Sequence, residues 1–465
     1  MQKIKLEKLY FNNKWQRPKS KKKFVNKTFE NNLISLPLGN SKDILNAISS
    51  ASLGEKKFSI LSNKQKSKIL EKISIKIKKN ASILAKKEQL ELGKGFLNAK
   101  KEMIACSNLW KHASKVIKKR KTKIFKKGKT KLLEIYEPVG IVALIVPWNF
   151  PMIVLSERLP YILAAGNSVL IKPSEYGSLS IQYFVNLINS VGLPKGTVNF
   201  ITGDYKTGEQ IIKNKSVNMI SFTGSTSSGK KIYKNSSDSI KRLSLELGGK
   251  NPMVIFKDAD LNKSCNDVIY SFLHNAGQCC VSGSRLFVDT KIFNKFTKLM
   301  GIKLKKIKNF QSTTTSHQYK KIKKIILKAI KDRIPIIYRN KTLFDDKRRI
   351  IYPIVFMPKN KKSYLDQEIF GPVLTINSFK NENILVKEMN NTKFGLSALI
   401  WTKNTEKALI IASKIKSGRI WINGNISQNY PDISIGGYKE SGMNRETGAS
   451  GINTYSEIKS IIINK

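Results

Sequence analysis

Two adjacent cysteines, Cys279 and Cys280, are the first candidates for chemistry in this chain of 465 residues. They lie in the small-residue segment GQCCVSGSR at 277–285. A nucleophilic cysteine needs a positioned base or an electropositive environment that favours its thiolate. The chain has only 3 histidines, so the usual partner is scarce. A bare cysteine pair is often structural, and from this segment alone both interpretations stay open.

Glu246 is the candidate base. It ends an apolar run that predicts a buried strand, and the residues LGGK that follow it include two glycines, which let backbone or a ligand approach closely. A buried carboxylate is costly unless it is paired or does chemistry, and burial raises its pKa toward the range of a general base for water. The structural alternative is an ion pair with Lys250 or Arg242.

Asn149 is the third candidate. It lies in PWNFP at 147–151, where two prolines restrict the backbone on either side of the amide. A side-chain amide held in this way can donate a hydrogen bond to a developing oxyanion. The alternative is an ordinary turn asparagine.

Short apolar runs alternate with helical patterns from Gly140 onward, which predicts an α/β fold. Such runs are typical of strands buried on both faces, so we expect a parallel sheet with crossover helices. The runs cover residues 141–146, 169–172, 199–202, 219–222, 243–247 and 252–256. Residues 64–90 have helical spacing, and the N-terminal region is expected to be largely helical. A hairpin over 124–136, turning at Gly128, and a strand over 455–463 are also expected.

Groups able to bind phosphate or sugar follow four of these runs at their carboxyl ends, where ligands bind in parallel sheets. They are Asn149, Lys172 with Glu175, Gly203, and Gly224 with Ser225. This is the pattern of a dinucleotide site. The G-x-G-x-x-G fingerprint is absent, and the wider pair Gly203 and Gly208 by itself is a weak signal.

The formal charge of +53 invites a nucleic-acid interpretation. The lysines are spread along the chain instead of clustered, which favours solvated faces, and we expect no nucleic-acid partner. Four cysteines and 3 histidines show no zinc-site spacing, so no metal is expected. The start lacks signal-peptide features, and the most apolar stretch, 141–155, is too short and interrupted to span a bilayer. We therefore expect no membrane partner and a cytoplasmic location.

Taken together and in order, the motifs resemble those of the aldehyde dehydrogenase superfamily over nearly the whole chain. They are PWNFP at 147–151, KPSE at 172–175, FTGST at 222–226, ELGGK at 246–250, GQCC at 277–280, EIFGPV at 368–373, FGLSALIWT at 394–402, and GGYKESG with RETG within 436–448.

The resemblance implies a Rossmann-type NAD-binding domain at 1–117 and 139–247. It also implies an α/β catalytic domain at 248–437, and a small β oligomerisation element from 118–138 and 438–465. A homodimer or homotetramer is the expected assembly.

The resemblance further implies that Cys280, rather than Cys279, attacks an aldehyde. The thiohemiacetal that forms would be stabilised by the Asn149 amide and the Cys280 backbone N–H, and it would be oxidised with NAD to a thioester. Water activated by Glu246 would then release the carboxylic acid. Arg158 and Glu446 match positions near the base, either as a proton relay or as a structural ion pair.

For the cofactor, the resemblance puts Lys172 and Glu175 on the adenine ribose, Ser225 on the pyrophosphate, and Glu368 on the nicotinamide ribose with Phe370 nearby. Gly203 and Gly208 complete the expected cofactor-binding set. The Glu175 carboxylate should repel a 2′-phosphate, which favours NAD over NADP, although flanking lysines would soften this preference.

The expected substrate tunnel contains Phe150, Val154, Glu157 and Ile435. Ser434-Ile435 stands where the family commonly has Pro-Phe, so an aromatic wall of the tunnel is missing. Glu157 would favour a cationic, betaine-aldehyde-like substrate, unless it pairs with Arg158. The rival functions are a coenzyme A-acylating enzyme, which the retained Glu246 argues against, and a basic nucleic-acid-binding protein without catalysis.

Overall fold

The computed structural model describes residues 3–359 and 363–464, and the chain divides into two compact units. The first unit contains Met1–Leu245, Tyr430–Ile435 and Asn444–Lys465. The second unit contains Glu246–Asn429 and Gly436–Met443. The assignment of NAD binding, catalysis and oligomerisation to separate parts of the chain stays a prediction.

The first unit is built around a largely parallel sheet. Its strands, in spatial order, are β12 (Arg242–Glu246), β11 (Met219–Thr223), β8 (Ile141–Val146), β9 (Ser168–Pro173), β10 (Val198–Phe200), β2 (Leu9–Phe11) and β3 (Lys14–Gln16). Strand β8 pairs in parallel with β11 and β9, and β9 pairs in parallel with β10. Strands β2 and β3 extend one edge in antiparallel fashion.

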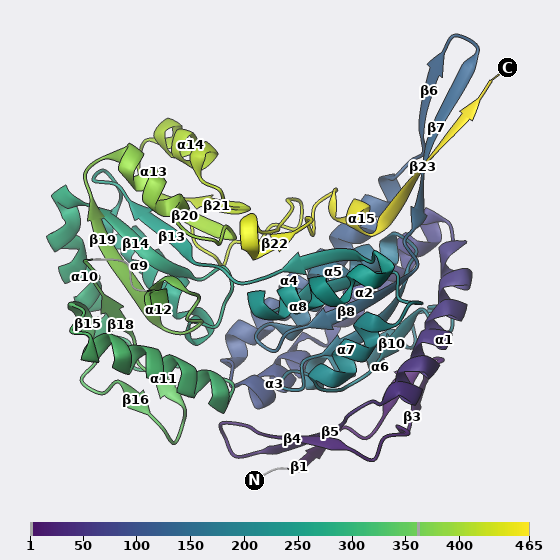
Figure 1. Cartoon of the computed structure of the whole chain (residues 1–465), viewed down its shortest axis with the longest axis horizontal. Helices are drawn as coiled ribbons and strands as arrows, with labels where there is room; N and C mark the ends of the chain where they lie inside the picture. Colours follow the sequence, from purple (N-terminus) through teal and green to yellow (C-terminus); the bar gives the residue numbers. More distant parts are fainter. Residues whose placement is uncertain (1–2, 360–362, 465) are drawn as a thin grey trace. The chain divides into compact units, whose positions relative to one another are not determined.

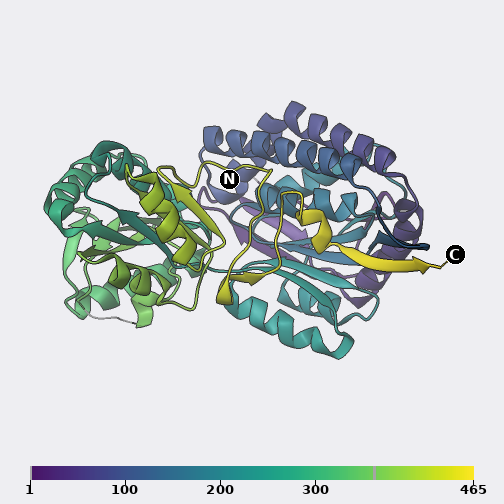
Figure 2. The same ribbon diagram turned by 90° about the horizontal axis from the view of Figure 1, so that it is seen from above.

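Helices cover both faces of this sheet, as Figure 2 shows. They are α1 (Ser41–Ser59), α2 (Asn63–Lys79), α3 (Ala81–Leu92), α4 (Phe96–Lys119), α5 (Pro151–Ala164), α6 (Leu179–Ile188), α7 (Tyr205–Lys213), α8 (Thr226–Asn235) and the short α15 (Gly451–Thr454). Because both faces are covered, the strands are continuous apolar runs, and this is why the sequence pattern revealed them.

Three expectations about the elements need correction. The run at 252–256 forms β13 (Asn251–Ile255), which belongs to a different sheet from the five runs before it. The helical pattern of 64–90 is two helices, because the chain turns at Asn80 between α2 and α3. Residues 3–37 are not helical: β1 (Lys3–Lys5), β5 (Leu33–Pro37) and β4 (Lys23–Lys27) form a small sheet. Apolar runs reveal strands but not the sheet that each strand joins.

The second unit has its own sheet, which contains in spatial order β15 (Ile336–Arg339), β18 (Ile354–Phe356), β19 (Val373–Phe379), β14 (Gly283–Asp289), β13, β20 (Ser397–Trp401) and β21 (Arg419–Ile422). Its helices are α9 (Leu261–Leu273), α10 (Phe293–Lys305), α11 (Ser316–Lys331), α12 (Ser363–Asp366), α13 (Glu382–Asn390) and α14 (Thr405–Lys414). One short pair, β16 (Phe344–Asp345) with β17 (Ile350–Ile351), and the strand β22 (Gly442–Met443) complete the strands of this unit.

Alternate residues of β13 face the two sides of the second sheet, as the pleat of a strand requires. Met253 and Ile255 pack with α9 and α10. Val254 and Phe256 pack with α13 and α14. The unit is therefore a three-layer α/β/α sandwich. The candidate residues lie in the segments that lead into β13 and β14.

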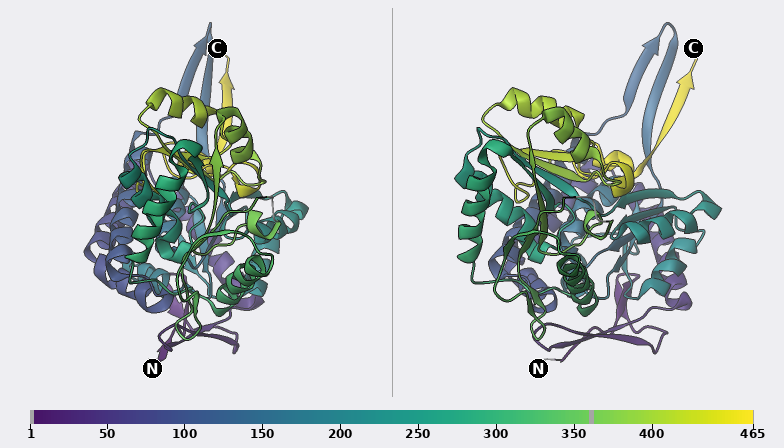
Figure 3. Two further views of the ribbon diagram at one scale, coloured as in Figure 1. Left: turned by 90° about the vertical axis from the view of Figure 1, so that its left-hand side faces the viewer. Right: turned by 60° about the vertical axis from the view of Figure 1, so that its left-hand side comes forward.

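The expected hairpin and terminal strand are confirmed. Strands β6 (Lys123–Lys127) and β7 (Thr130–Pro138) pair across the turn at Gly128, and β23 (Ser456–Ile463) pairs with β7. This three-stranded ribbon projects away from the helices of the first unit (Figures 1 and 3). Large apolar side chains of the ribbon are exposed, among them Phe125, at 51%, and Ile462, at 67%.

Within residues 3–359 and 363–464, no helix combines the length and the apolar character needed to cross a bilayer. The same residues contain no cluster of three or more His, Cys, Asp or Glu side chains arranged to hold a metal ion.

Candidate active site

The loop that carries Cys280 follows a left-handed turn at the end of α9. Asn275, Ala276 and Gly277 all have positive φ, at 52°, 56° and 71°. The buried Gln278 braces this turn: its Nε2 donates to the Asn275 carbonyl at 2.9 Å, and its Oε1 accepts from the Thr314 backbone N–H at 2.9 Å. The turn ends the helix abruptly and leads directly into the cysteine pair.

The two thiols differ in accessibility. Cys279 is buried, at 8% exposure, whereas Cys280 is partly exposed. A nucleophile has to reach its substrate, so this difference favours Cys280 as the reactive thiol.

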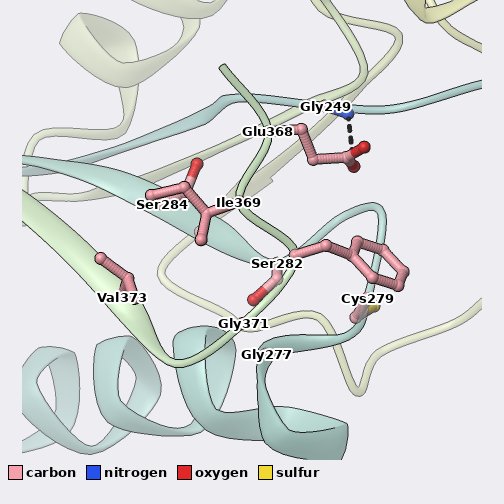
Figure 4. A pocket seen from close by; sticks show the side chains of 11 residues that line it. Gly249, Gly277, Cys279, Ser282, Ser284, Glu368, Ile369, Gly371 and Val373 are labelled. Atoms are coloured by element: carbon pink, nitrogen blue, oxygen red, sulfur yellow. Dashed lines mark hydrogen bonds between the residues drawn. The ribbon is translucent and has the colours of Figure 1, made fainter. Parts of the chain in front are cut away.

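Close glycine contacts bring three of the predicted motifs together in the second unit. A Cβ atom on Gly277 would lie 2.4 Å from the Gly371 carbonyl oxygen, and one on Gly249 would lie 2.7 Å from the Cys280 carbonyl oxygen. A Cβ on Gly248 would lie 2.4 Å from the Glu368 carboxylate. The segments ELGGK, GQCC and EIFGPV are therefore in mutual contact, and they line one pocket (Figure 4).

Glu246 is the last residue of β12 and is buried, at 7% exposure. The backbone after it is held on both sides of Leu247: the Leu247 N–H donates to the Ser441 carbonyl at 2.8 Å, and the Ser441 hydroxyl donates to the Gly248 carbonyl at 2.7 Å. The ion pair of Arg242 is with Glu457. Gly249, three residues after Glu246, contacts the Cys280 peptide. Glu246 is therefore close in sequence to the point of contact with the nucleophile.

Glu368 and Lys250 are two buried titratable groups beside this segment. The Glu368 carboxylate accepts a hydrogen bond from the Gly249 N–H at 3.1 Å (Figure 4). Desolvation raises the pKa of Glu368 to about 7 and lowers the pKa of Lys250 to about 7, with Arg285 lowering the latter further. Phe370 follows with a positive φ of 59°, and its carbonyl accepts a hydrogen bond from Gln318.

The first unit brings together part of the expected cofactor set. Lys172 is buried, and its methylene groups lie 3.6 Å from the position of a Cβ on Gly208. Burial lowers the pKa of Lys172, while Glu175 and Asp204 act in the opposite direction. Gly203 has a packing role of its own, because a Cβ there would collide with the Thr207 side chain at 2.2 Å.

Ser225 caps the N-terminus of α8 by accepting a hydrogen bond from the Ser228 N–H at 3.1 Å. Ser225 is exposed. The free N–H groups and the dipole at this end of a helix favour an anionic group such as a phosphate. Two separate stretches of the first unit, the Lys172 region and the start of α8, are thus suited to different parts of a dinucleotide.

Helix α5 carries the remaining candidates. Asn149 and Phe150, just before it, and Val154 within it are buried. Glu157 pairs with Arg158, with 3.4 Å between Oε2 and Nη1, so the structural alternative for Glu157 is present in the molecule.

Arg158 also lies 3.9 Å from Glu446, measured from Nε to Oε1. Glu446 accepts hydrogen bonds from Ser244 and from the Tyr455 hydroxyl, and it forms a β-bridge with Ile435. Burial raises the pKa of Glu446, and Arg158 opposes this. Glu157, Arg158, Glu446 and Ile435 are therefore connected in one network.

In each unit, buried residues that bind the candidates escaped the sequence reasoning. Asn251 binds the Cys280 loop, and Tyr455 and Ser244 bind Glu446. The Lys94 ammonium lies 4.2 Å from the centre of the Phe150 ring. Asn251 directly follows the ELGGK motif, and this proximity is the one signal that could have drawn attention to it.

Comparison with known proteins finds similar sequences and folds over nearly the whole chain. The sequence model of the aldehyde dehydrogenase family matches residues 15–461. The chain is 31% identical to betaine aldehyde dehydrogenase of Bacillus subtilis (strain 168) over 458 residues, which cover 95% of this chain and 93% of that protein. It is 32% identical to retinaldehyde dehydrogenase 3 of Rattus norvegicus, with coverages of 99% and 93%.

Two solved structures are similar over nearly their full length. The NAD-dependent aldehyde dehydrogenase from Sinorhizobium meliloti superposes with a TM-score of 0.95 at 30% identity, covering 99% of this chain and 95% of that one. A betaine aldehyde dehydrogenase from Staphylococcus aureus, solved in complex with NAD+, has a TM-score of 0.94 at 29% identity, with coverages of 98% and 97%.

Proposed function

Since this chain belongs to the aldehyde dehydrogenase family and oxidises aldehydes with NAD, we propose that Cys280 is its nucleophile and Glu246 its general base. The observation that carries this proposal is the contact between the segment starting at Glu246 and the Cys280 peptide, through Gly249. The partial exposure of Cys280 beside the buried Cys279 supports the choice of thiol.

The Cys280 thiolate adds to the aldehyde carbon, and a carbon–sulfur bond forms while the carbonyl π electrons move to oxygen. The alkoxide accepts hydrogen bonds from the Asn149 amide and the Cys280 backbone N–H. NAD, when bound, supplies the acceptor for the hydride that leaves the former aldehyde carbon. Glu246 removes a proton from water, which attacks the resulting thioester, and the carbon–sulfur bond breaks to release the acid and the thiolate.

The residues present fit a dinucleotide. The exposed N-terminus of α8 with Ser225 suits the pyrophosphate, and the buried Lys172 over Gly208 suits a ribose. In the second unit, Glu368 beside the glycines of ELGGK suits the nicotinamide ribose, with Phe370 next to it. Glu175, two residues beyond the end of β9, favours a ribose with a free 2′-hydroxyl, so we propose NAD ahead of NADP.

Glu246 also favours water over coenzyme A as the acceptor of the acyl group, because a thiol acceptor needs no base to activate water. A product assay with and without coenzyme A checks this. Free acid formed at an unchanged rate supports hydrolysis, whereas an acyl-coenzyme A product contradicts it.

We propose a cationic aldehyde, of the betaine aldehyde or amino aldehyde kind, as the substrate. Burial raises the pKa of Tyr161 in α5, and the three carboxylates Glu157, Glu446 and Asp432 raise it further. Arg158 compensates only part of this negative charge. In a chain with a formal charge of +53, this local group of carboxylates would favour a cation.

Kinetics with betaine aldehyde and succinate semialdehyde test this substrate class. We expect the higher kcat/KM with betaine aldehyde, and a selective loss of that preference in Glu157→Gln. Better turnover of the semialdehyde by the unaltered enzyme would contradict the proposal.

We further propose a cytoplasmic homodimer or homotetramer that is assembled through β6, β7 and β23. The exposed Phe125 and Ile462 on this ribbon and the unpaired edges of its strands support this role. Ile462→Lys should reduce the molar mass measured by light scattering, and an unchanged mass would contradict the assignment of this surface.

The central test compares Cys280→Ala with Cys279→Ala in an NAD-reduction assay over cationic, neutral and anionic aldehydes. We expect Cys280→Ala to abolish turnover and Cys279→Ala to retain most of it. Turnover that survives in Cys280→Ala would overturn the mechanism.

A further inference from the structure

The buried Asn251, the first residue of β13, is bonded directly to the peptide of Cys280. Its Nδ2 donates to the Cys280 carbonyl at 2.7 Å and to the Ser282 carbonyl at 2.8 Å. Its Oδ1 accepts from the Ser397 backbone N–H at 3.0 Å. Asn251 is 1% exposed. Both amide hydrogens and the amide oxygen are therefore used, and the bonds to Ser282 and Ser397 are buried.

Ser397, at the start of β20, binds the carbonyl group between those of Cys280 and Ser282. Its hydroxyl donates to the Val281 carbonyl at 3.1 Å, and Ser397 is fully buried. Three consecutive carbonyl groups, those of residues 280, 281 and 282, are thus each bonded by a side chain from a neighbouring strand. The backbone that follows the thiol is tied to β13 and β20 and cannot shift independently of the sheet.

Gly249 leaves the room that this arrangement needs. A Cβ on Gly249 would lie 2.7 Å from both the Cys280 carbonyl oxygen and the Asn251 Oδ1. The same stretch of chain therefore contains the base Glu246, the glycine that permits close approach, and the amide that binds the nucleophile's peptide. The segment that begins at the base is therefore the segment that contacts the peptide of the nucleophile.

We propose that Asn251 is a positioning residue that sets the Cys280 backbone, and hence the thiol, relative to the segment of Glu246. The proposal rests on the assignment of Cys280 as the nucleophile. An asparagine suits the task because it offers two donors to two carbonyl oxygens and one acceptor to an N–H group, while remaining uncharged. Aspartate has the same shape but would direct a carboxylate oxygen at both carbonyl oxygens and add a negative charge beside the thiolate.

The first unit provides a matched control in Asn167. Its Nδ2 donates to the Ile162 and Tyr455 carbonyls at 3.0 and 2.9 Å, and its Oδ1 accepts from the Gly140 N–H at 2.9 Å. Asn167 is fully buried. Asn167→Ala thus removes the same kinds and the same number of hydrogen bonds without touching the Cys280 loop.

The experiment compares Asn251→Ala, Asn251→Asp and Asn167→Ala in the full chain. The readouts are the thermal midpoint, kcat, the KM for NAD, and the rate of Cys280 alkylation by iodoacetamide, followed by peptide mass spectrometry. We expect the two alanine variants to lose similar stability. Asn251→Ala should lower kcat by about 10–100-fold with little change in the KM for NAD, because a small displacement of a reacting group is costly, whereas Asn167→Ala should stay within about threefold.

Asn251→Asp gives a readout that a purely structural role would not change. The added charge disfavours the thiolate, so the pH profile of Cys280 alkylation should move to higher pH. An unchanged profile together with equal kcat losses in Asn251→Ala and Asn167→Ala would overturn the proposal.

If Asn251→Ala does not fold, Ser397→Ala tests the same anchor by removing one hydroxyl. We expect it to slow alkylation and turnover together, and an unchanged rate of both would contradict the proposal. Cys280→Ala separates the two hypotheses, since activity retained there would refute the choice of nucleophile without bearing on whether Asn251 binds the loop.

Discussion

Gly277 lies against Gly371 so closely that a Cβ on Gly277 would fall 2.3 Å from the Gly371 carbonyl carbon. This contact joins the turn before the cysteine pair to the segment that carries Glu368 and Phe370. It also explains a glycine that the sequence alone showed only as the first letter of a motif. Two loops that are distant in the sequence can meet here because neither presents a side chain.

Gly277→Ala should therefore displace the Cys280 loop and sharply lower turnover. The added methyl group meets backbone, which cannot move aside as a flexible side chain would, and the φ of 71° adds strain of roughly 1 kcal/mol. Gly128→Ala is the matched control, since Gly128 has a φ of 58° but nothing within 4 Å of the added Cβ. Steady-state kinetics and thermal midpoints of both variants check this, and equal effects would mean that the Gly371 contact does not matter.

Glu246→Gln should separate the two halves of the reaction. Attack by Cys280 and the oxidation that follows do not need a base for water, so a first burst of NADH should persist. Release of the acid should slow by about 100-fold or more, because the base that activates water is absent. Stopped-flow absorbance measures both phases. A variant that loses its burst as completely as Cys280→Ala does would contradict the role of Glu246 in hydrolysis.

Lys94→Met should destabilise the first unit. The Lys94 ammonium lies 2.7 Å from Glu88 and 2.6 Å from Glu102, and Glu88 in turn accepts the Met152 N–H at 3.1 Å. Removing the cation leaves buried carboxylates uncompensated, which costs about 3–5 kcal/mol. The thermal midpoint should fall markedly.

Lys123→Met is the control for that change, because Lys123 pairs with Glu134 at 3.2 Å on an exposed strand. A pair exposed to solvent contributes little, so no measurable shift in the midpoint is expected. Similar shifts in both variants would show that burial of the Lys94 cluster has no special importance.

Stability should depend on pH through Glu91, a buried carboxyl group that accepts the N–H groups of Ser178 and Leu179. Desolvation raises the pKa of Glu91 from the ordinary value of 4.5 to about 7. Between these values the folded chain binds more protons than the unfolded chain, so the contribution of Glu91 to stability is full below the lower value and declines as the pH rises through the upper one.

Glu91→Gln should therefore reduce the fall in thermal midpoint between about pH 5 and about pH 8, because the amide does not titrate. Glu209→Gln serves as the comparison, since Glu209 is paired with Lys213 at 2.7 Å and its pKa is lowered by that pair. A fall that is the same in Glu91→Gln as in the unaltered chain would contradict the assignment.

The order and content of the motifs were enough to identify the family, and with it the choice of Cys280, Glu246 and Asn149 as candidates. The apolar runs were enough to predict the buried strands, because a strand covered on both faces must be apolar throughout. The hairpin of the ribbon was also predictable, because two strand-like segments lie on either side of a probable turn at Gly128. These features depend on side-chain type and on spacing along the chain.

Tertiary structure alone decided which strands β13 pairs with, that Glu157 pairs with Arg158, and that Asn251 holds the Cys280 peptide. For the strand partners and for Asn251 the physical reason is the same. Strand partners and the carbonyl groups that Asn251 binds are backbone features common to every residue, and they leave no mark on the sequence. The sequence named Cys280 as the thiol to consider, while the fold determined which neighbours hold it.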